Sequence, residues 1–549
     1  MKKNRLFAIL ICLILLVSIA ACNKDAGGSA SSPPASGGSS NSPSSSASPG
    51  DSGGSSSGGS GDSQGAASAR DTLTIAVTAD SGTLNPIRMS GDFAVITRCI
   101  QESMWDIDEY GNFRWFLATS VDEVALDKWI IHLREGVKFS NGSDFKANDV
   151  LFSMQMTADG GFSSAPRVQN VDVANCKVID DYTLEVALWD YHVSAYTILS
   201  DFLVFDEDTY DEESFATNPI GTGPYVVDEY MVNSYVHLSR RDDYWGEPSA
   251  IPHLVFRVLA EPSQIVNALE TGMIDTGPIS SDNIDYVKTL PGFHLESRYG
   301  QWTAIYFNMF KGIFFDNVDA RRAICHAIDR NVITNLVYNG YAKPMFSVVS
   351  DAANDYESRF DNADDTYTIG YNVALAKELA QKSGLAGQSI RVITNGTAPH
   401  VTMAEIMQDQ LKAIDVDVQI NNYDVASFMS VVQDPSRSMY EIWIGSVSQI
   451  NRIVADPMVN GVRYSPAYQE PDVWADIWEF LEVGPQCFYN PDPQKHSDYT
   501  FRTLQMYESG VLSYAFCDYE AYTAFSNDLA GPFVWRNNGR LRYADFKFA

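Results

Sequence analysis

The chain has 549 residues, with 38 basic and 70 acidic side chains, and its formal net charge is −32 at pH 7. A surface this acidic repels phosphate backbones, which argues against nucleic-acid binding. The length is too great for one simple core, so we expect two or three packed lobes.

The first 21 residues are typical of an export signal. They begin with a cluster of basic residues, and an apolar run follows at 6–19. The run is too short to span a bilayer, which needs about 20 apolar residues. Small residues precede Cys22, as in a bacterial lipobox, so we predict that Cys22 is lipidated and becomes the mature N-terminus. An ordinary cleavage site with an incidental cysteine is the alternative.

Residues 23–70 consist almost entirely of Gly, Ser, Ala, Pro and Asp. Such a composition cannot bury a core, so this segment is predicted to be a disordered tether with an r.m.s. reach of about 35–40 Å. Residues 50–54 and 54–58 match the motifs around protease and lipase nucleophiles. A Gly/Ser tract supplies neither a base nor an oxyanion hole, so we interpret both matches as coincidence.

The composition changes sharply at residue 70, where regular secondary structure is expected to begin. Alternation of apolar and polar residues predicts strands at 71–77, 129–134 and 181–188. A helix is predicted to start near Phe145, with Asn148 or Asp149 at its positive end.

Residues 218–277 contain three blocks in close order. Residues 218–225 read Asn-Pro-Ile-Gly-Thr-Gly-Pro-Tyr, which predicts a turn leading into a strand. Residues 241–246 read Arg-Asp-Asp-Tyr-Trp-Gly and separate two strand-like runs. A short helix is predicted from Pro262 to Gly272.

A strand followed by a helix is predicted at 304–308 and 315–330. Asp329 then has the position of a cap for a second helix that ends at Asn339 and Gly340. Together with the three earlier blocks, this pattern resembles the family 5 extracellular solute-binding proteins, the dipeptide/oligopeptide-type receptors of ATP-binding-cassette (ABC) importers. The resemblance covers nearly all of residues 71–549.

Strands and helices alternate between residues 389 and 446, with strands predicted at 389–394, 416–420 and 441–444. This alternation predicts parallel pairing by right-handed crossovers. Parallel sheets bind ligands at the carboxyl ends of their strands. Gly445 and Ser446 are therefore expected at the edge of a cleft.

The resemblance implies an α/β fold of the periplasmic-binding-protein type (type 2), with two large mixed α/β lobes, a hinge and an inserted smaller lobe. The ligand would lie between lobes I and III, and the chain would cross between them near 297–308 and Cys517. The implied segments are 71–114, 215–305 and 518–549 for lobe I, 115–214 for lobe II, and 306–517 for lobe III.

Five residues are predicted to bind the ligand: Thr83, Trp302, Trp443, Gly445 and Ser446. Thr83 belongs to the first loop, which the resemblance puts at the mouth of the cleft. Clefts for peptides or sugars need flat apolar faces, and the two tryptophans are expected to flank the ligand from opposite lobes. A core position is the alternative for each tryptophan.

The sequence departs from the family where peptide receptors hold a ligand's ammonium group. Those proteins tend to carry Gly-Trp-x-Ala-Asp at this point, whereas residues 444–449 read Ile-Gly-Ser-Val-Ser-Gln. Asp456 could replace the acid only if there is an insertion. An oligopeptide is the first choice of ligand. An oligosaccharide, or a role as a non-transport sensor on the same scaffold, is the alternative.

No catalytic or metal motif is evident. The eight histidines lack the spacing of a zinc protease, no phosphate-binding loop is present, and residues 361–365 lack the features of a calcium loop. We therefore expect a monomeric receptor rather than an enzyme, without metal or cofactor. It would be lipid-anchored to the outer face of the cell membrane, or lie in the periplasm, and work with permease subunits of an ABC transporter.

The cysteine pattern does not indicate a disulfide framework. Of the seven cysteines, those after Cys22 are odd in number and scattered. Separate buried thiols are favoured over one bridge between Cys487 and Cys517, which an exported protein would permit.

Overall fold

The computed structural model describes residues 70–88, 93–160, 165–190, 195–351, 356, 358, 369–434, 436–448, 477–484, 486–536 and 539–549. All of them belong to one structural unit, which begins at Ala66. The predicted signal, Cys22, the tether, the acidic segment 361–365 and Asp456 lie outside the described residues.

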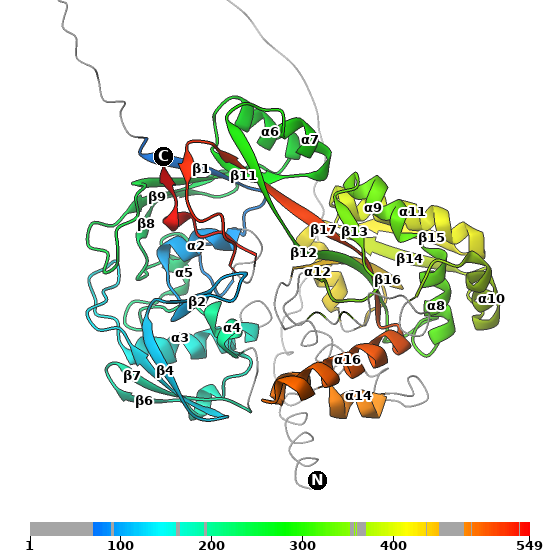
Figure 1. The fold of residues 1–549 in the computed structure, drawn as a ribbon, viewed down its shortest axis with the longest axis horizontal. Helices are drawn as coiled ribbons and strands as arrows, with labels where there is room; N and C mark the ends of the chain where they lie inside the picture. Colours follow the sequence, from blue (N-terminus) through cyan, green and yellow to red (C-terminus); the bar gives the residue numbers. More distant parts are fainter. Residues whose placement is uncertain are drawn as a thin grey trace, which may run out of the picture. The chain divides into compact units, whose positions relative to one another are not determined.

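One eleven-stranded sheet organises this unit, and its two longest strands lie side by side at its centre (Figure 1). Strand β13 (Ala342–Pro344) pairs with β17 (Ser513–Ser526) and is not part of the continuous order of strands. The other strands follow in the order β15 (Asp417–Asn422), β14 (Ser389–Thr394), β16 (Ile442–Ser448), β12 (Phe293–Phe307), β17 (Ser513–Ser526), β11 (Thr276–Ile279), β1 (Thr72–Val77), β10 (His253–Val258), β9 (Tyr235–Arg240) and β8 (Tyr225–Met231).

The predicted parallel pairing is confirmed, since β14 runs parallel to both β15 and β16. Strand β16 extends four residues beyond the predicted end at Ile444, because it pairs antiparallel with β12 along its whole length. Gly445 and Ser446 therefore lie inside a strand rather than just after it.

Helices pack around the β14–β16 end of the sheet, and all of them except α12 (Val425–Gln433), which packs in a smaller cluster with Ile393 and Tyr440, share its largest apolar core. Local signals determine several of their ends. The side chain of Asp329 accepts a hydrogen bond from the Asn331 backbone, and Asn339 ends the same helix in the left-handed conformation, as predicted. The helices are α8 (Val318–Ala327), α9 (Arg330–Tyr338), α10 (Val373–Ser383), α11 (Ala398–Leu411), α12 (Val425–Gln433), α14 (Ile477–Val483), α15 (Gln486–Tyr489) and α16 (Pro493–Gly510).

The other end of the sheet has its own apolar cores, which involve α2 (Ala94–Ile100), α6 (Pro262–Glu270) and α7 (Ile284–Val287). The turn at 218–225 packs against the end of α2. The Gly223 backbone donates a hydrogen bond to the Ile100 carbonyl over 2.8 Å, and a Cβ atom at Gly223 would lie 2.6 Å from that oxygen. The glycine is required by this close approach of two backbones.

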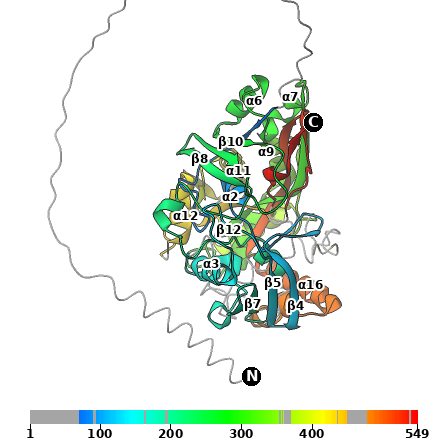
Figure 2. The same ribbon diagram turned by 90° about the vertical axis from the view of Figure 1, so that its left-hand side faces the viewer.

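A separate four-stranded antiparallel sheet has the order β4 (Ala118–Ala125), β5 (Lys128–Leu133), β7 (Thr183–Ala187) and β6 (Lys177–Asp180). Helix α3 (Ala147–Asp159) packs beside it over a third core (Figure 2). Asp149 accepts a hydrogen bond from the Lys146 backbone at the start of α3, as predicted. The remaining elements are β2 (Trp105–Ile107), β3 (Phe113–Trp115), α4 (Ala195–Ser200), α5 (Glu212–Phe215), β18 (Leu529–Ala530) and β19 (Lys547–Phe548).

The expectation of separate buried thiols is confirmed for the cysteines in the described residues. Cys99, Cys176, Cys325, Cys487 and Cys517 are all buried thiols that form no disulfide with one another. Cys487 contacts the Thr503 hydroxyl and Cys517 contacts the Thr303 hydroxyl, so the alternative of a bridge between these two cysteines is wrong.

A buried carboxylate stabilises the point where β12 and β17 shift register. Pairing is interrupted between Arg298 and Gln301, and Gly300 has a φ of 99°. The carboxylate of Asp518, with 0% of the residue exposed, accepts hydrogen bonds from the backbone amides of Gly300 and Gln301 over 3.0 and 3.1 Å. The Ser350 hydroxyl donates to its other oxygen, and burial raises the pKa of this carboxyl group.

We expect Asp518→Ala to lower the free energy of unfolding by about 2 kcal/mol or more, because buried amides that lose an acceptor cost about 1–3 kcal/mol each. Urea denaturation of the full chain measures this change. Asp409→Ala is the control, since Asp409 is an exposed residue of α11 that forms a surface ion pair with Lys412. An equal, small effect of both substitutions would contradict the role given to Asp518.

Candidate functional site

A cavity of about 480 Å³ lies beside β12 and β17, and we call it the central cavity. The end of β1, the segment after β11 and residues of the C-terminal segment line one side. The ends of α9 and the start of α11 line the other, and residues 519–523 of β17 pass between them. The cavity therefore contacts both ends of the large sheet.

The lining combines aromatic faces with a few charged groups, as expected of a ligand site. Tyr338 and Tyr519 stack with their ring centroids 4.8 Å apart and an interplanar angle of 8°. Glu520 accepts hydrogen bonds from the hydroxyls of Ser297 and Tyr522. The walls also contain Arg298, Gln301, Arg540 and Asp282.

A chain of hydrogen bonds connects the start of α11 to β16. His400 lies 2.7 Å from the Asn395 side-chain oxygen through Nδ1, and 2.7 Å from the Ser446 hydroxyl through Nε2. The same Asn395 oxygen accepts hydrogen bonds from the backbone and hydroxyl of Thr397, so it also acts as an acceptor toward His400. Nδ1 must then carry the proton, and Nε2 accepts the hydroxyl proton of Ser446.

This order of side chains is that of a nucleophile, a base and an orienting residue. The electrostatics do not suit nucleophilic catalysis at neutral pH, because burial lowers the pKa of the His400 imidazole from 6.5 to about 4. A base this weak gives little activation of a hydroxyl. The arrangement instead fixes the orientation of the Ser446 hydroxyl. Ser446 is exposed, and the lone pairs of its hydroxyl oxygen stay available to accept hydrogen bonds.

The predicted binding residues divide between the two faces of the β12–β16 pair. Trp302 is opposite residue 447, and Trp443 is opposite Tyr306. Since side chains alternate along a strand, the two tryptophans share one face with Gly445, and Ser446 lies on the other face with His400. The expectation that the two tryptophans flank the ligand from opposite sides is wrong, because their side chains lie on the same face of neighbouring strands.

The surroundings of the two tryptophans differ. Trp443 is half-buried and stacks on Tyr306 at 4.0 Å and 11°. Its indole ring covers Gly445, where any Cβ atom would overlap the ring. Trp302 is 3% exposed and belongs to the apolar core of this end of the sheet. The core alternative thus describes the environment of Trp302 well, while its role toward a ligand stays a prediction.

Thr83 lies in the loop after β1, where its hydroxyl accepts a hydrogen bond from the Asn85 backbone. Thr78, at the start of the same loop, lines the central cavity. Sequence reasoning missed Arg298, Tyr519 and Arg540. The sequence did indicate this region, because the chain was predicted to cross between two lobes near 297–308 and Cys517. The first range contains Arg298, and Cys517 is two residues from Tyr519.

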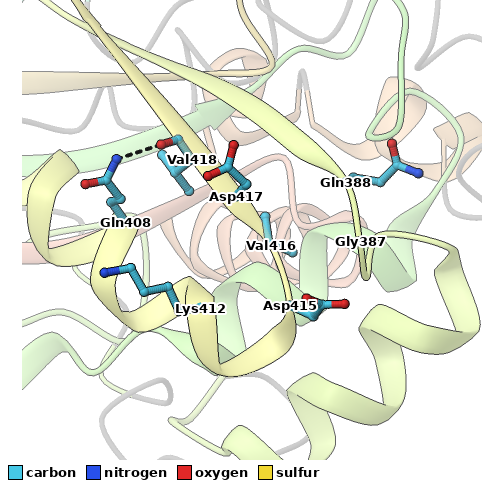
Figure 3. A pocket seen from close by; sticks show the side chains of 8 residues that line it. All are labelled: Gly387, Gln388, Gln408, Lys412, Asp415, Val416, Asp417 and Val418. Carbon is cyan, nitrogen blue, oxygen red and sulfur yellow. Dashed lines mark hydrogen bonds between the residues drawn. The ribbon is translucent and has the colours of Figure 1, made fainter.

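A second hollow of about 430 Å³ lies within the α/β end of the sheet (Figure 3). Gln388 precedes β14 and Asp417 begins β15, so the hollow is at the amino ends of these parallel strands. Gln408 is already hydrogen-bonded to the Val418 carbonyl over 2.7 Å. Ligands of such sheets bind at the opposite, carboxyl ends, so the central cavity is the better candidate.

Comparison with known proteins agrees with this architecture. Residues 113–459, more than half of the chain, match the family model described as "Bacterial extracellular solute-binding proteins, family 5 Middle". The nickel-binding periplasmic protein of Escherichia coli is 25% identical over 67% of this chain and 74% of that protein. The oligopeptide-binding protein OppA of Bacillus subtilis is 21% identical over 75% of this chain and 82% of that protein.

Solved structures share the fold. A periplasmic binding protein, DppA of Helicobacter pylori in complex with the peptide STSA, has a TM-score of 0.75 at 19% identity, over 87% of this chain and 98% of that one. A dipeptide-binding protein of Pseudoalteromonas in complex with Met-Leu has a TM-score of 0.74 at 20% identity, over 87% and 100%. The structure therefore has the periplasmic-binding-protein fold, and the central cavity lies beside β12 and β17. The chain belongs to the bacterial extracellular solute-binding proteins, family 5.

His400 gives the stability of the fold a pH dependence of known sign. Its pKa is lower in the folded chain than the ordinary 6.5, so its contribution to stability is complete above pH 6.5 and is lost as the pH falls toward 4. We expect this single group to contribute up to about 3 kcal/mol to the loss, at about 1.4 kcal/mol per pKa unit.

Denaturation of wild type and His400→Gln at pH 7 and pH 4.5 measures the contribution as the difference between their pH dependences. His132→Gln is the control, since His132 is an exposed residue beside Asp122. If His400→Gln loses as much stability on acidification as wild type does, the imidazole is not held neutral by the fold.

Proposed function

We propose that this chain is a receptor that captures a short peptide outside the cytoplasm and delivers it to the permease of an ABC importer. The observation that carries the proposal is the central cavity, which is lined from both ends of a sheet connected through β12 and β17. Membership of family 5 and the relatives named for peptide binding support it.

In the proposed mechanism, lobes I and III close about β12 and β17, the strands that connect them. The boundaries of the three lobes are those predicted from the sequence. Lobes joined by few strands are expected to hinge. A ligand favours the closed state only through contacts made better in that state. The cavity provides such contacts, because Tyr338 and Pro399 lie on one side and Ala76 to Thr78 on the other.

A peptide fits the polar groups of the site. The Ser446 hydroxyl is outside the cavity lining, but its partner His400 directly follows the lining residue Pro399, and the hydroxyl can accept a hydrogen bond from a peptide N–H group. Asp282 and Glu520 line the central cavity and can pair with a peptide's ammonium group, which replaces the acid missing from residues 444–449. A sugar would use the same aromatic faces but not the ammonium partners, and an oligosaccharide remains the second candidate.

Calorimetry of the full chain with tetrapeptide mixtures tests this function, and oligosaccharide mixtures serve as the comparison. We expect Ser446→Ala to weaken peptide binding about fivefold, the equivalent of one hydrogen bond of about 1 kcal/mol. Trp443→Ala should cost about thirtyfold if the indole is a ligand wall, since a buried aromatic anchor contributes about 2 kcal/mol or more. Trp302→Ala, Gly445→Ala and Thr83→Ala complete the set of predicted contacts.

Failure of every peptide mixture to bind folded wild type would contradict peptide capture. If both tryptophan variants stay folded and bind as tightly as wild type, the two residues belong to the core only. Acetylation of the peptides' amino termini distinguishes the anchors. A large loss of affinity on acetylation would implicate Glu520 or Asp282, whereas no loss would mean that the ammonium group is not recognised.

We also propose that lipid on Cys22 holds the receptor at the outer face of the membrane. Small residues before Cys22 and the Gly/Ser-rich tract after it support this anchor. Two acyl chains hold a protein stably on a membrane where one does not. Within the described part of the chain, no helix is long and apolar enough to cross a bilayer.

Cys22→Ala should therefore move the protein from the membrane fraction to the soluble fraction. Cell fractionation measures the change, and mass spectrometry of the mature N-terminus detects the lipid. Cys12→Ala is the matched control, because it leaves the residues around Cys22 intact. An unmodified wild-type N-terminus, or the same fractionation for both variants, would contradict lipidation.

A further inference from the structure

Strand β17 loses its regular ladder on both edges near Glu520. On the β12 edge the register shifts between Arg298 and Gln301, directly opposite Glu520. On the other edge β11 pairs with residues 522–525 and β13 pairs with residues 517–519, so Glu520 lies between these two strands. A sheet bends where its ladder is disrupted. Glu520 therefore marks the point about which the two ends of this sheet can change their angle.

Two segments meet at the gap between β11 and β13. The first follows β11 and consists of a 3₁₀ turn, η4 (Ser281–Asn283), and helix α7. The second is the end of α9 with the turn at 339–341 that leads into β13. By the boundaries predicted from the sequence, the first segment belongs to lobe I and the second to lobe III. Contacts between the two segments therefore bridge the proposed hinge without using the ladder of β12 and β17.

Hydrogen bonds between side chains join the two segments directly. The Asn339 amide donates to the Asp282 carboxylate over 2.8 Å. The Tyr341 hydroxyl donates to the Asp285 carboxylate and accepts a hydrogen bond from the Lys288 ammonium group over 3.0 Å. We call Asp282, Asp285, Lys288, Asn339 and Tyr341 the clasp. Each of these hydrogen bonds has one partner in each predicted lobe.

The turn after α9 and strand β17 determine where the clasp forms. Asn339 ends α9 with a φ of 52°, a left-handed conformation that Asn tolerates better than most residues, and Gly340 follows with a φ of 83°. The Tyr341 carbonyl then accepts a hydrogen bond from the Glu520 backbone amide over 3.0 Å. The Tyr341 ring packs edge-on against Tyr522, with the ring centroids 5.5 Å apart. The Tyr341 hydroxyl is thus positioned by β17 at the bending point, whereas its two partners belong to the segment after β11.

The clasp lies at the surface. Tyr341 is half-buried, and the other members of the clasp are exposed. Contacts between exposed polar groups contribute little individually, so the clasp biases the lobe angle rather than locks it. A rotation about Glu520 moves one segment past the other, and a hydrogen bond weakens steeply when donor and acceptor move out of line. Bending would therefore disrupt the clasp while it leaves the interior of each lobe intact.

We propose that the clasp is a conformational device that stabilises the angle between lobes I and III found in this structure, with Glu520 as the pivot. This inference rests on the proposed function and deepens it, because a captured solute would shift the lobe angle only against, or together with, this built-in bias. Loss of the clasp should let the lobes sample other angles without any solute.

Distances between spin labels on the two lobes of the full chain, measured without added peptide, test the clasp. The labels are attached through an unnatural amino acid at Ala250 in lobe I and at Lys377 in lobe III, both of which are exposed, so the seven native cysteines stay unlabelled. Double electron–electron resonance then gives the distribution of distances between the labels.

We expect Tyr341→Phe combined with Asn339→Gly to raise the population outside the main wild-type distance about fivefold, the equivalent of one hydrogen bond of about 1 kcal/mol. Phenylalanine keeps the ring that packs against Tyr522, and glycine keeps the left-handed backbone at position 339. The two substitutions therefore remove the hydrogen bonds of the clasp and little else.

Tyr286→Phe combined with Asn233→Gly is the matched control. The Tyr286 hydroxyl is also on α7, but it donates to Glu270 within lobe I, and Asn233 has a φ of 60° in the turn between β8 and β9. This variant should keep the wild-type distribution. An unchanged distribution in the folded clasp variant, or equal broadening in the control, would overturn the clasp. If the clasp variant does not fold, Tyr341→Phe alone decides by the same criterion.

A second measurement, with the tetrapeptide mixture, separates this inference from peptide capture. If the clasp variant broadens without peptide, and the mixture neither binds wild type nor shifts its distribution, peptide capture fails and the clasp holds. If the mixture binds wild type and shifts its distribution, but the clasp variant without peptide matches wild type, peptide capture holds and the clasp fails.

Discussion

The position of the central cavity depends on one buried carboxylate, that of Asp518, at the point where the paired strands β12 and β17 shift register. Between Arg298 and Gln301 the ladder of β12 and β17 is interrupted, so two backbone amides of β12 would lack strand partners. Asp518 accepts hydrogen bonds from both of these amides. Because buried amides must be paired, this side chain determines where the bulge can form and how the strands continue beyond it.

The same few residues that flank the bulge also belong to the candidate site. Arg298 and Gln301 on β12, and Tyr519 and Glu520 on β17, all line the central cavity. A change of angle between the two ends of the sheet would have to pass through this segment. Under the proposed function, ligand contact and lobe closure would therefore both involve one short stretch of each strand, which gives binding a direct physical route to closure.

Local patterns predicted the elements well, because their causes lie within a few residues. Alternation located β1 and β14, and the Asp329 cap located the start of α9. The face on which a side chain lies is a long-range property, since it depends on the pairing of β16 with β12. The predicted sandwich of Trp302 and Trp443 was wrong for that reason. Likewise, no spacing in the sequence relates Arg298 to Gly539, which meet only through the return of the C-terminal segment.

The net charge of −32 affects how a solute would be attracted under the proposed function. At physiological salt the Debye length is about 8 Å, so the acidic side chains act on a solute mainly at short range. Asp282 and Glu520 line the central cavity, so a solute with an ammonium group would be attracted by them chiefly after it enters. Closure would exclude water and lower the local dielectric, which strengthens this attraction. The charge pair would then be worth more in the closed state than in the open one, and this difference is what a solute needs to drive closure.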